Sequence, residues 1–515
     1  MQNEAHTNRR AGVALPLSSL RGADDVGSGT ILDLLPFIDW CAVWQLRLIQ
    51  LLPLNEAAPS EASPYRALSA FAVDPSYISA RRVPEVMASR AAQSWLATEQ
   101  VQRRIAAARQ ASSRDRKLSH GINARLLEFA FAELEAGNYP ERRAALDTFC
   151  RQQAEWLDEY ALFRALSERR RFSDWQTWPA EVRGYNAAVQ SGAALALAPR
   201  LRFAKYIQWL AWEQWQQVHA HARRHDVLLK GDVAFMCAPN SADVWAHPEW
   251  FDLRSSAGTP PDAFSATGQM WDLPISNWEA QRQSGYEWWR RRARQAGRLF
   301  DVFRVDHVVG LYRTYAIAQR HGGASGFVPP DEETQRRQGH EILQAIQEEA
   351  SPALVVGEDL GTIPDWVRTS LHELGIPGYK VFRWEQRDGQ FIDPHTYSPA
   401  SVVTTSTHDT DTLVEWWATL PAAERHAVCA MLGIDTPDSL PWQPLLRRLL
   451  GAPSRLAVFP LQDLLQWTER INVPATVGEH NWGYRLPIAV DQLERAPGVA
   501  ALLEQLRALI LASGR

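Results

Sequence analysis

The sequence predicts an α/β protein, more specifically a (β/α)8 TIM barrel that carries a large helical insertion. Three observations support this. The chain has 515 residues, which suits either several ordinary domains or one barrel with insertions. From about residue 226 onward, short apolar runs alternate with helical stretches. Between residues 81 and 200, Ala, Arg, Gln and Glu dominate and apolar residues recur at helical spacing.

The composition is that of an ordinary globular protein, with 46% hydrophobic and 22% charged residues. The net charge of −5 and pI of about 6.3 do not suit a polyanionic partner, so we expect no nucleic acid. We also expect no membrane association, because no uncharged apolar run reaches membrane-spanning length. The first twenty residues lack the apolar core of a signal peptide.

The four cysteines lie far apart and form no C-x-x-C pair: Cys41, Cys150, Cys237 and Cys429. This spacing predicts neither a disulfide framework nor a cysteine-based zinc site, and it favours the reducing cytoplasm. The 22 tryptophans are the unusual feature of the composition. Aromatic faces stack on sugar rings, so the excess indicates a carbohydrate protein; the alternative is that these side chains pack the core.

Along the chain, residues 1–80 are expected to hold the first barrel strands and the loops at the mouth, because 12–80 is strand- and loop-like. Residues 81–200 are expected to form the helical insertion subdomain. Within it, the 7, 4 and 3 spacing of Phe149, Trp156, Tyr160 and Phe163 predicts one helix face. Residues 201–225 predict another amphipathic helix, and 201–515 the remainder of the barrel.

Four short apolar or β-branched runs end in acidic residues: 226–232, 299–306, 353–359 and 401–409. Continuous apolar strands are typical of a parallel sheet buried on both faces. In a parallel barrel the carboxyl ends of all strands surround one mouth, where barrel enzymes keep their active sites. Asp232, Asp306, Glu358 and Asp409 are therefore expected to converge there.

One alternative is that these acids are helix N-caps, a role that Asp fills well. Helix capping could explain any one of these acids. It is a weaker explanation for all four together, because His307 and His408 stand beside two of them. Several carboxylates in one pocket instead indicate glycosidic chemistry. One ionised carboxylate attacks the anomeric carbon, and a second, kept protonated, protonates the leaving oxygen.

Arg304 precedes Asp306 by two residues, so both side chains point to the same face of the strand. We expect this cation to hold the negative charge of the attacking Asp306, and His307 to donate to sugar hydroxyls. The alternative is that Arg304 and Asp306 form a purely structural ion pair.

Several ordered segments resemble the 4-α-glucanotransferases of the α-amylase clan, glycoside hydrolase family 77, also called amylomaltases or disproportionating enzymes. The resemblance runs from about residue 14 to 486. It rests on "LPLNEAAPSEASPYRALSAFAVDPSYI", "GDVAFMCAPNSADVWAHPEWFDL", "AGTPPDAFSATGQMWDLPISNW", "FRVDH", "VVGEDLG", "THDTDT", "SRLAVFPLQDLL" and "NWGYRL". Any one of these segments is a weak indication, but this many in order is specific.

The resemblance implies roles for these residues. Asp306 would be the nucleophile, Glu358 the general acid/base and Asp409 the carboxylate that steadies the distorted sugar. Asp232, Arg304, His307 and His408 would bind the sugar at the cleavage point, and Tyr65 would stack on it. Gln269 and Trp271 would line the substrate-covering loop 259–274. No metal or organic cofactor is implied.

The implied reaction is a retaining transfer of α-1,4-glucan segments between a maltooligosaccharide donor and acceptor. The sequence departs from the family at Val309, where an arginine is usual, and Arg313 is a candidate replacement. It departs again at Asp272, within the covering loop, and at Ala475, where glycine is usual. Two other functions remain open: an α-1,4-glucan hydrolase of the same clan, and a glucan-binding protein without turnover.

Overall fold

The structure is a computed structural model that describes residues 8–261, 268–435, 438–474, 476, 478 and 480–515. Six residues of the expected covering loop, 262–267, and Ala475 therefore lie outside the described part. The described helices include none with the length and apolarity that a membrane span requires.

Eight parallel strands form the barrel, in the order β10-β13-β14-β1-β2-β3-β6-β9. The Gly357 N–H of β9 donates to the oxygen of Pro377, just before β10, at 2.9 Å and brings the two edges together. The predicted barrel is confirmed, and all four predicted strands are present. The strands are β1 (Arg10–Leu15), β2 (Leu48–Leu51), β3 (Leu228–Val233), β6 (Val302–Val305), β9 (Leu354–Gly357), β10 (Gly378–Val381), β13 (Ser401–Thr404) and β14 (Leu456–Pro460).

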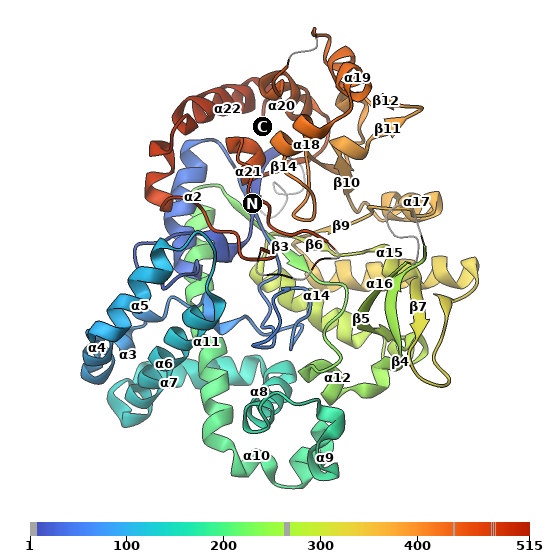
Figure 1. Cartoon of the computed structure of the whole chain (residues 1–515). Helices are drawn as coiled ribbons and strands as arrows, with labels where there is room; N and C mark the ends of the chain where they lie inside the picture. The colour runs from blue at the N-terminus through green and yellow to red at the C-terminus, as the bar shows by residue number, and fades with distance from the viewer. Residues whose placement is uncertain (1–7, 262–267, 436–437, 475, 477, 479) are drawn as a thin grey trace.

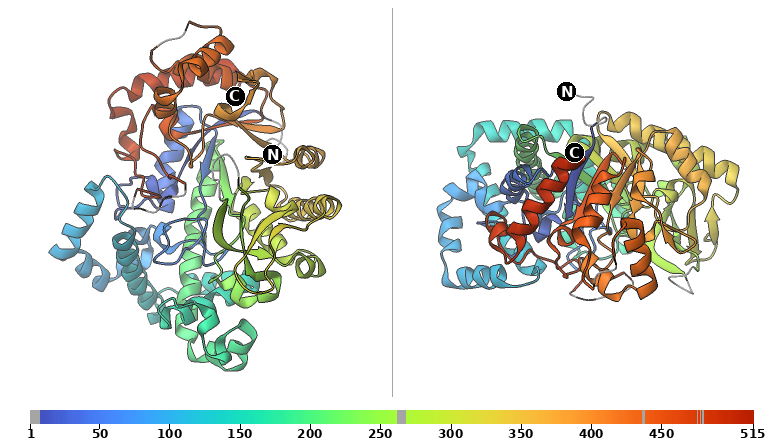
Figure 2. Two further views of the ribbon diagram at one scale, coloured as in Figure 1. Left: turned by 45° about the vertical axis from the view of Figure 1, so that its right-hand side comes forward. Right: turned by 90° about the horizontal axis from the view of Figure 1, so that it is seen from above.

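Helices surround the barrel and bury its outer face (Figures 1 and 2). They are α2 (Leu34–Val43), α11 (Ala198–Arg224), α14 (Glu287–Leu299), α16 (Glu332–Ala350), α17 (Asp365–Glu373), α18 (Leu413–Thr419), α19 (Ala422–Leu432), α20 (Trp442–Gly451), α21 (Leu461–Leu465) and α22 (Val499–Ser513). The long amphipathic helix predicted at 201–225 is α11. The helix α2 was not expected, since residues 12–80 read as strand and loop.

The helical block covers the left and lower sides of the barrel in Figure 1, and its part at the left lies across the barrel from the antiparallel sheet. It contains α3 (Pro84–Ala88), α4 (Arg90–Leu96), α5 (Glu99–Gln110), α6 (Arg116–Glu133), α7 (Pro140–Gln152), α8 (Ala154–Arg169), α9 (Tyr185–Gln190) and α10 (Ala193–Ala196). The prediction of one helix through Phe149 and Phe163 is wrong. The chain breaks at Gln153, whose φ and ψ are −111° and 9°, so Phe149 lies on α7 and the other three aromatic residues on α8. All four are nevertheless buried.

A second, four-stranded antiparallel sheet stands beside the barrel. Its strands are β4 (Phe251–Thr259), β5 (Gln269–Ser276), β7 (Thr314–Ala318) and β8 (Gly326–Val328). The segment expected to be a loop at 259–274 is thus partly a strand, and Gln269 and Trp271 lie on β5. The remaining elements that bear on the site are α12 (Ala242–Ala246), α13 (Trp278–Gln283), α15 (Val309–Tyr312), β11 (Gln386–Arg387) and β12 (Gln390–Phe391).

Most of the tryptophans pack the core, as the alternative reading held. Trp178, Trp215, Trp245, Trp288 and Trp289 are among the largest fully buried side chains. Trp271, Trp384 and Trp482 instead lie at or near the barrel mouth and keep part of their surface exposed.

Candidate active site

The four acids lie at the carboxyl ends of four barrel strands. Asp232 is in β3, Asp306 and Glu358 directly follow β6 and β9, and Asp409 lies five residues beyond β13. None of them caps the helix that comes next. The N-caps of α12, α15, α17 and α18 are Ser241, Val308, Pro364 and Thr412. The helix-capping alternative is therefore wrong for all four acids.

Arg304 holds two of the acids at once. Its Nη1 donates to Asp232 Oδ1 and Oδ2 at 2.8 and 2.7 Å, while its Nη2 lies 2.7 Å from Asp306 Oδ1. Tyr65 Oη also donates to Asp232 Oδ2, at 2.8 Å. Burial alone would lower the pKa of Arg304, but the charges of Asp232 and Asp306 outweigh it and raise that pKa above its usual range. The expected contact between Arg304 and Asp306 is present, and the same guanidinium also binds Asp232.

The two carboxylates differ in their access to the mouth. The Asp232 side chain is 1% exposed, whereas that of Asp306 is 22% exposed. Burial raises the pKa of Asp232, with the Arg304 cation opposing and the Asp306 charge adding to the rise. Asp306 is thus the member of the pair that an entering substrate can reach.

Glu358 is held close to Asp306 through the backbone. Its Oε2 accepts a hydrogen bond from the His307 N–H at 2.8 Å. His307 has a φ of +45°, a left-handed conformation that costs energy and turns the chain directly after Asp306. Burial raises the pKa of Glu358 to about 8; the Arg304 cation opposes this shift and the Asp306 charge adds to it. A carboxyl that keeps its proton at neutral pH beside a second carboxylate is what general acid catalysis requires.

His307 and Trp271 meet beside Asp306. The Trp271 ring packs edge-on against the His307 ring, with centroids 4.8 Å apart. Burial lowers the pKa of His307 to about 4, and the Arg304 cation adds to that effect. His307 therefore presents a neutral imidazole at neutral pH, which can donate to a hydroxyl from one nitrogen.

Asp409 is oriented by a residue that the sequence analysis missed. Asn472 Nδ2 donates to Asp409 Oδ1 at 2.7 Å, and His408 Nε2 lies 3.4 Å from Asp409 Oδ2. The His408 ring stacks on Tyr65 with centroids 5.4 Å apart, and Trp482 lies against both rings at 5.8 and 5.9 Å. Trp482 was also missed as a site residue, although it stands in the "NWGYRL" segment.

Strand β5 is tied to the Tyr65 loop by Arg66. Arg66 Nη1 donates to the Trp271 oxygen and Nη2 to Asp272 Oδ2, both at 2.9 Å. Gln269 Oε1 accepts from Trp271 Nε1 at 3.4 Å. Asp272, one of the departures from the family pattern, thus secures the covering segment. Arg313, the candidate replacement for the missing arginine, packs over the Phe327 ring of the antiparallel sheet, 4.1 Å from its centroid.

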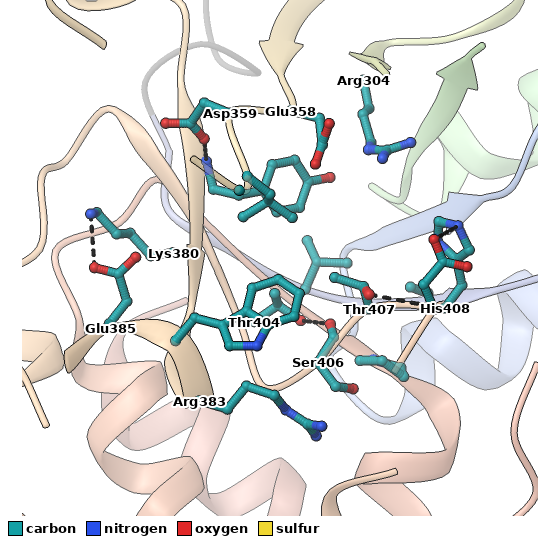
Figure 3. A pocket seen from close by; sticks show the side chains of 18 of the residues that line it. Arg304, Glu358, Asp359, Lys380, Arg383, Glu385, Thr404, Ser406, Thr407 and His408 are labelled. Carbon is teal, nitrogen blue, oxygen red and sulfur yellow. Dashed lines mark hydrogen bonds and ion pairs between the residues drawn. The ribbon is translucent and has the colours of Figure 1, made fainter. Parts of the chain in front are cut away.

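A cavity of about 800 Å³ extends from Glu358 and Asp409 toward β10 and β13, and neither Asp232 nor Asp306 is among its lining residues. Of the predicted site residues, Arg304, Glu358, His408 and Asp409 line it. Figure 3 shows Glu358 beside Arg304 at one edge and Arg383 on the opposite side. Trp384, which is 46% exposed, also lines the cavity and offers an aromatic face. The volume is within the range of sites that enclose an extended small ligand.

The structure brings the predicted site residues together at one mouth. Tyr65 connects the Arg304–Asp232 pair to the His408–Asp409 segment, because it donates to Asp232 and stacks on His408. Burial raises the pKa of Tyr65, and the charges of Asp232, Asp306 and Asp409 add to this rise. Within the described residues, the one cluster of His, Cys, Asp or Glu with metal-ligating spacing lies elsewhere, at Asp39, His221 and His225.

A family model described as 4-alpha-glucanotransferase matches residues 15–490. The 4-alpha-glucanotransferase of Chlamydia muridarum is 31% identical, covering 98% of this chain and 96% of its own length. The 4-alpha-glucanotransferase of Thermus thermophilus is 33% identical, covering 85% of this chain and 87% of its own.

Two solved structures share the fold. The amylomaltase from Streptococcus agalactiae in complex with acarbose has a TM-score of 0.82 at 23% identity, covering 98% of this chain and 99% of that one. The amylomaltase from Corynebacterium glutamicum has a TM-score of 0.81 at 21% identity, covering 99% of this chain and 76% of that one.

Proposed function

The chain belongs to the 4-alpha-glucanotransferase family, and from that premise we propose how its residues carry out the transfer. The protein is an enzyme that moves α-glucan segments from a donor to an acceptor. The family, fold and enzyme class expected from the sequence are confirmed. Our proposal concerns the residue roles and the retaining double displacement by which they act.

In the first half-reaction, an Asp306 oxygen attacks the anomeric carbon of the donor. The bond from that carbon to the glycosidic oxygen breaks, and the Glu358 proton passes to the departing oxygen. Two features support these roles: Asp306 is paired with the Arg304 cation at 2.7 Å, and burial raises the pKa of Glu358 to about 8. The donor remains attached to Asp306 as a glycosyl ester.

In the second half-reaction, the 4-hydroxyl of an acceptor glucan attacks the same carbon. Glu358, now a carboxylate, takes the hydroxyl proton, and the ester bond to Asp306 breaks. Two inversions restore the α configuration. Water competes with the acceptor, and Trp271 on β5, packed against His307 at 4.8 Å, covers the reacting carbon.

The remaining site residues bind or position. Asp409, oriented by Asn472, faces the sugar ring and steadies its distorted form, and His408 and Tyr65 form a stacked surface beside it. His307 donates to a hydroxyl, and Gln269 supports Trp271 through its 3.4 Å contact. Asp232 is a special case. Because it is 1% exposed and bound by both Arg304 and Tyr65, we assign it to positioning the guanidinium rather than to direct sugar contact.

The single observation that carries the proposal is the difference between Asp306 and Glu358: the Arg304 cation lies 2.7 Å from Asp306, which is 22% exposed, whereas the Glu358 carboxyl accepts the His307 N–H, and burial raises its pKa. Pure maltotriose tests the transfer that these two acids are proposed to carry out. The enzyme should yield glucose and a ladder of longer maltodextrins. If only glucose and maltose appear, the hydrolase alternative holds. If maltoheptaose binds in a calorimeter and no product forms, the binding-protein alternative holds.

Two further expectations stay proposals. Residues 81–200 are proposed to act as an insertion subdomain, with 1–80 and 201–515 forming the catalytic barrel. The cytoplasm is the proposed location, supported by the wide spacing of the four cysteines, which form no C-x-x-C pair.

A further inference from the structure

We infer that Asp39, His221 and His225 form a binding site for a borderline divalent cation such as Zn²⁺, at the end of the barrel opposite the mouth. Asp39 lies on α2, His221 in the last turn of α11, and His225 caps the end of α11. These helices lead into the amino ends of β2 and β3. Arg47, directly before β2, anchors the cap by donating from Nη1 to the His225 oxygen at 2.8 Å.

Three ligand atoms converge at this place. Nε2 of His221 lies 2.7 Å and Nε2 of His225 lies 3.3 Å from the same oxygen, Asp39 Oδ1. The two imidazole centroids are 4.5 Å apart, and the three ligand atoms all lie within 4.8 Å of one another. The i, i+4 spacing puts both rings on the same helix face, so one helix supplies two ligands and its neighbour the third.

The two separations between a histidine Nε2 and Asp39 Oδ1 are close to those of a tetrahedral zinc site. With Zn–N and Zn–O bonds of about 2.0–2.1 Å, neighbouring ligand atoms are about 3.3 Å apart. The His225–Asp39 distance already has this value, and the His221–Asp39 distance must lengthen by about half an ångström. The Asp39 side chain is 53% exposed and that of His225 37%, which allows the adjustment and leaves the fourth position to water.

The ligand types select the class of ion. Two imidazole nitrogens and one carboxylate oxygen favour Zn²⁺, Ni²⁺ or Cu²⁺, whereas Mg²⁺ and Ca²⁺ prefer sets composed of oxygen. The sequence-based expectation of no metal concerned catalysis and cysteine ligands. This site contains neither a cysteine nor a residue of the barrel mouth.

One neighbour opposes the ion and provides a distinctive test. Arg224 Nη2 lies 3.2 Å from His221 Nδ1, so Nδ1 accepts a hydrogen bond in the metal-free structure. A histidine that binds a metal through Nε2 usually carries a proton on Nδ1 and donates it. The guanidinium must therefore turn away on binding, and it also repels the cation. Replacing Arg224 with glutamine should tighten metal binding.

Bound metal would join α2 to α11, the long helix that connects the helical block to the barrel. An ion that binds the folded chain and not the unfolded chain raises the unfolding temperature. Because the site lies away from the mouth, glucan transfer should not change.

The experiment uses the full-length, metal-free enzyme and Zn²⁺ alone, in competition with a chromophoric chelator. We expect one equivalent to bind. Asp39→Asn and His221→Ala, made separately, should each weaken binding by at least about tenfold. Arg224→Gln should strengthen binding, and the matched control His321→Ala, an exposed histidine elsewhere, should leave it unchanged. Zn²⁺ should raise the unfolding temperature of the parent and of the control but not of the two ligand variants.

The inference is overturned if Asp39→Asn and His221→Ala bind Zn²⁺ as tightly as the parent, since the ion would then lie elsewhere. It is also overturned if Mg²⁺ competes on equal terms with Zn²⁺, or if Arg224→Gln leaves the affinity unchanged or weaker. In those cases the three side chains form only a hydrogen-bonded cluster.

Discussion

Replacing Arg304 with lysine should separate the two contacts that its guanidinium makes simultaneously. Nη1 lies 2.7 Å from Asp232 Oδ2 and Nη2 lies 2.7 Å from Asp306 Oδ1. A single ammonium group cannot reproduce this forked geometry. An unpaired charge on Asp232, which is 1% exposed, would cost more than one on the more exposed Asp306. We therefore expect the lysine to stay paired with Asp232 and the contact to Asp306 to be lost.

The size of the effect follows from that one lost contact. A hydrogen bond to a charged group contributes about 1.5–3 kcal/mol, and Arg304 is 9% exposed, so solvent replaces little of it. If this contact orients Asp306 for attack, kcat/KM falls about 10- to 150-fold. The loss should appear in kcat, because the contact acts on the nucleophile rather than on distant sugar units.

The assay is the initial rate of glucose release from maltotriose, measured over a range of concentrations to separate kcat from KM. Arg313→Lys is the matched control. That side chain packs over Phe327 in the antiparallel sheet, so its kcat/KM should stay within about twofold of the parent value. A folded Arg304→Lys enzyme that keeps more than half of the parent kcat/KM would refute the reasoning.

Three other predictions concern protons and one newly found contact. Because burial raises the pKa of Glu358 to about 8, kcat/KM should fall about tenfold per pH unit above that value. A fall in kcat/KM on the alkaline side whose midpoint lies below pH 7 would contradict the role of Glu358 as the acid. Lys230 donates to Gln50 Oε1 and Tyr379 Oη at 2.6 Å each. Burial lowers its pKa in the folded protein to about 7, whereas in the unfolded chain this pKa is about 10.4. The folded parent should therefore gain stability relative to Lys230→Met as pH rises from 7 to 9, and a difference in unfolding temperature that does not change with pH would exclude this. Asn472→Ala removes the 2.7 Å contact to Asp409, whose side chain is 45% exposed. We expect a loss of about 1 kcal/mol in transition-state stabilisation, which is about a fivefold fall in kcat. An unchanged kcat would show that Asp409 does not need this contact for its orientation.

The sequence predicts the barrel well where burial dictates residue type. The apolar runs before Asp232, Asp306, Glu358 and Asp409 are strands because both their faces are covered, and that pattern is visible without a structure. The break between α7 and α8 is not visible, because Gln153 is neither glycine nor proline and the aromatic spacing continues across it. Strand β5 was also not expected, because the family resemblance implied a covering loop over 259–274.

Contacts between distant segments account for the rest of the site. The family resemblance implies that Asp232 binds the sugar, but its 1% exposure and its bonds to Arg304 and Tyr65 support our proposal that it positions the guanidinium. Asn472 and Trp482 reach the mouth from a segment far beyond the last catalytic strand end, and no spacing rule connects them to Asp409 or Tyr65. Lys230, a lysine inside the barrel, would be expected to be exposed from its residue type alone.

The covalent intermediate on Asp306 tests the central claim most directly. Fluoride leaves maltotriosyl fluoride without protonation by an acid, so this substrate can glycosylate a Glu358→Gln enzyme. That variant then lacks the base that activates an acceptor. Mass spectrometry of a protease digest should find the maltotriosyl mass on the peptide that contains Asp306, and Asp306→Asn should abolish it. A sugar attached at Asp409 or Asp232, or no adduct while free fluoride is still released, would contradict the account.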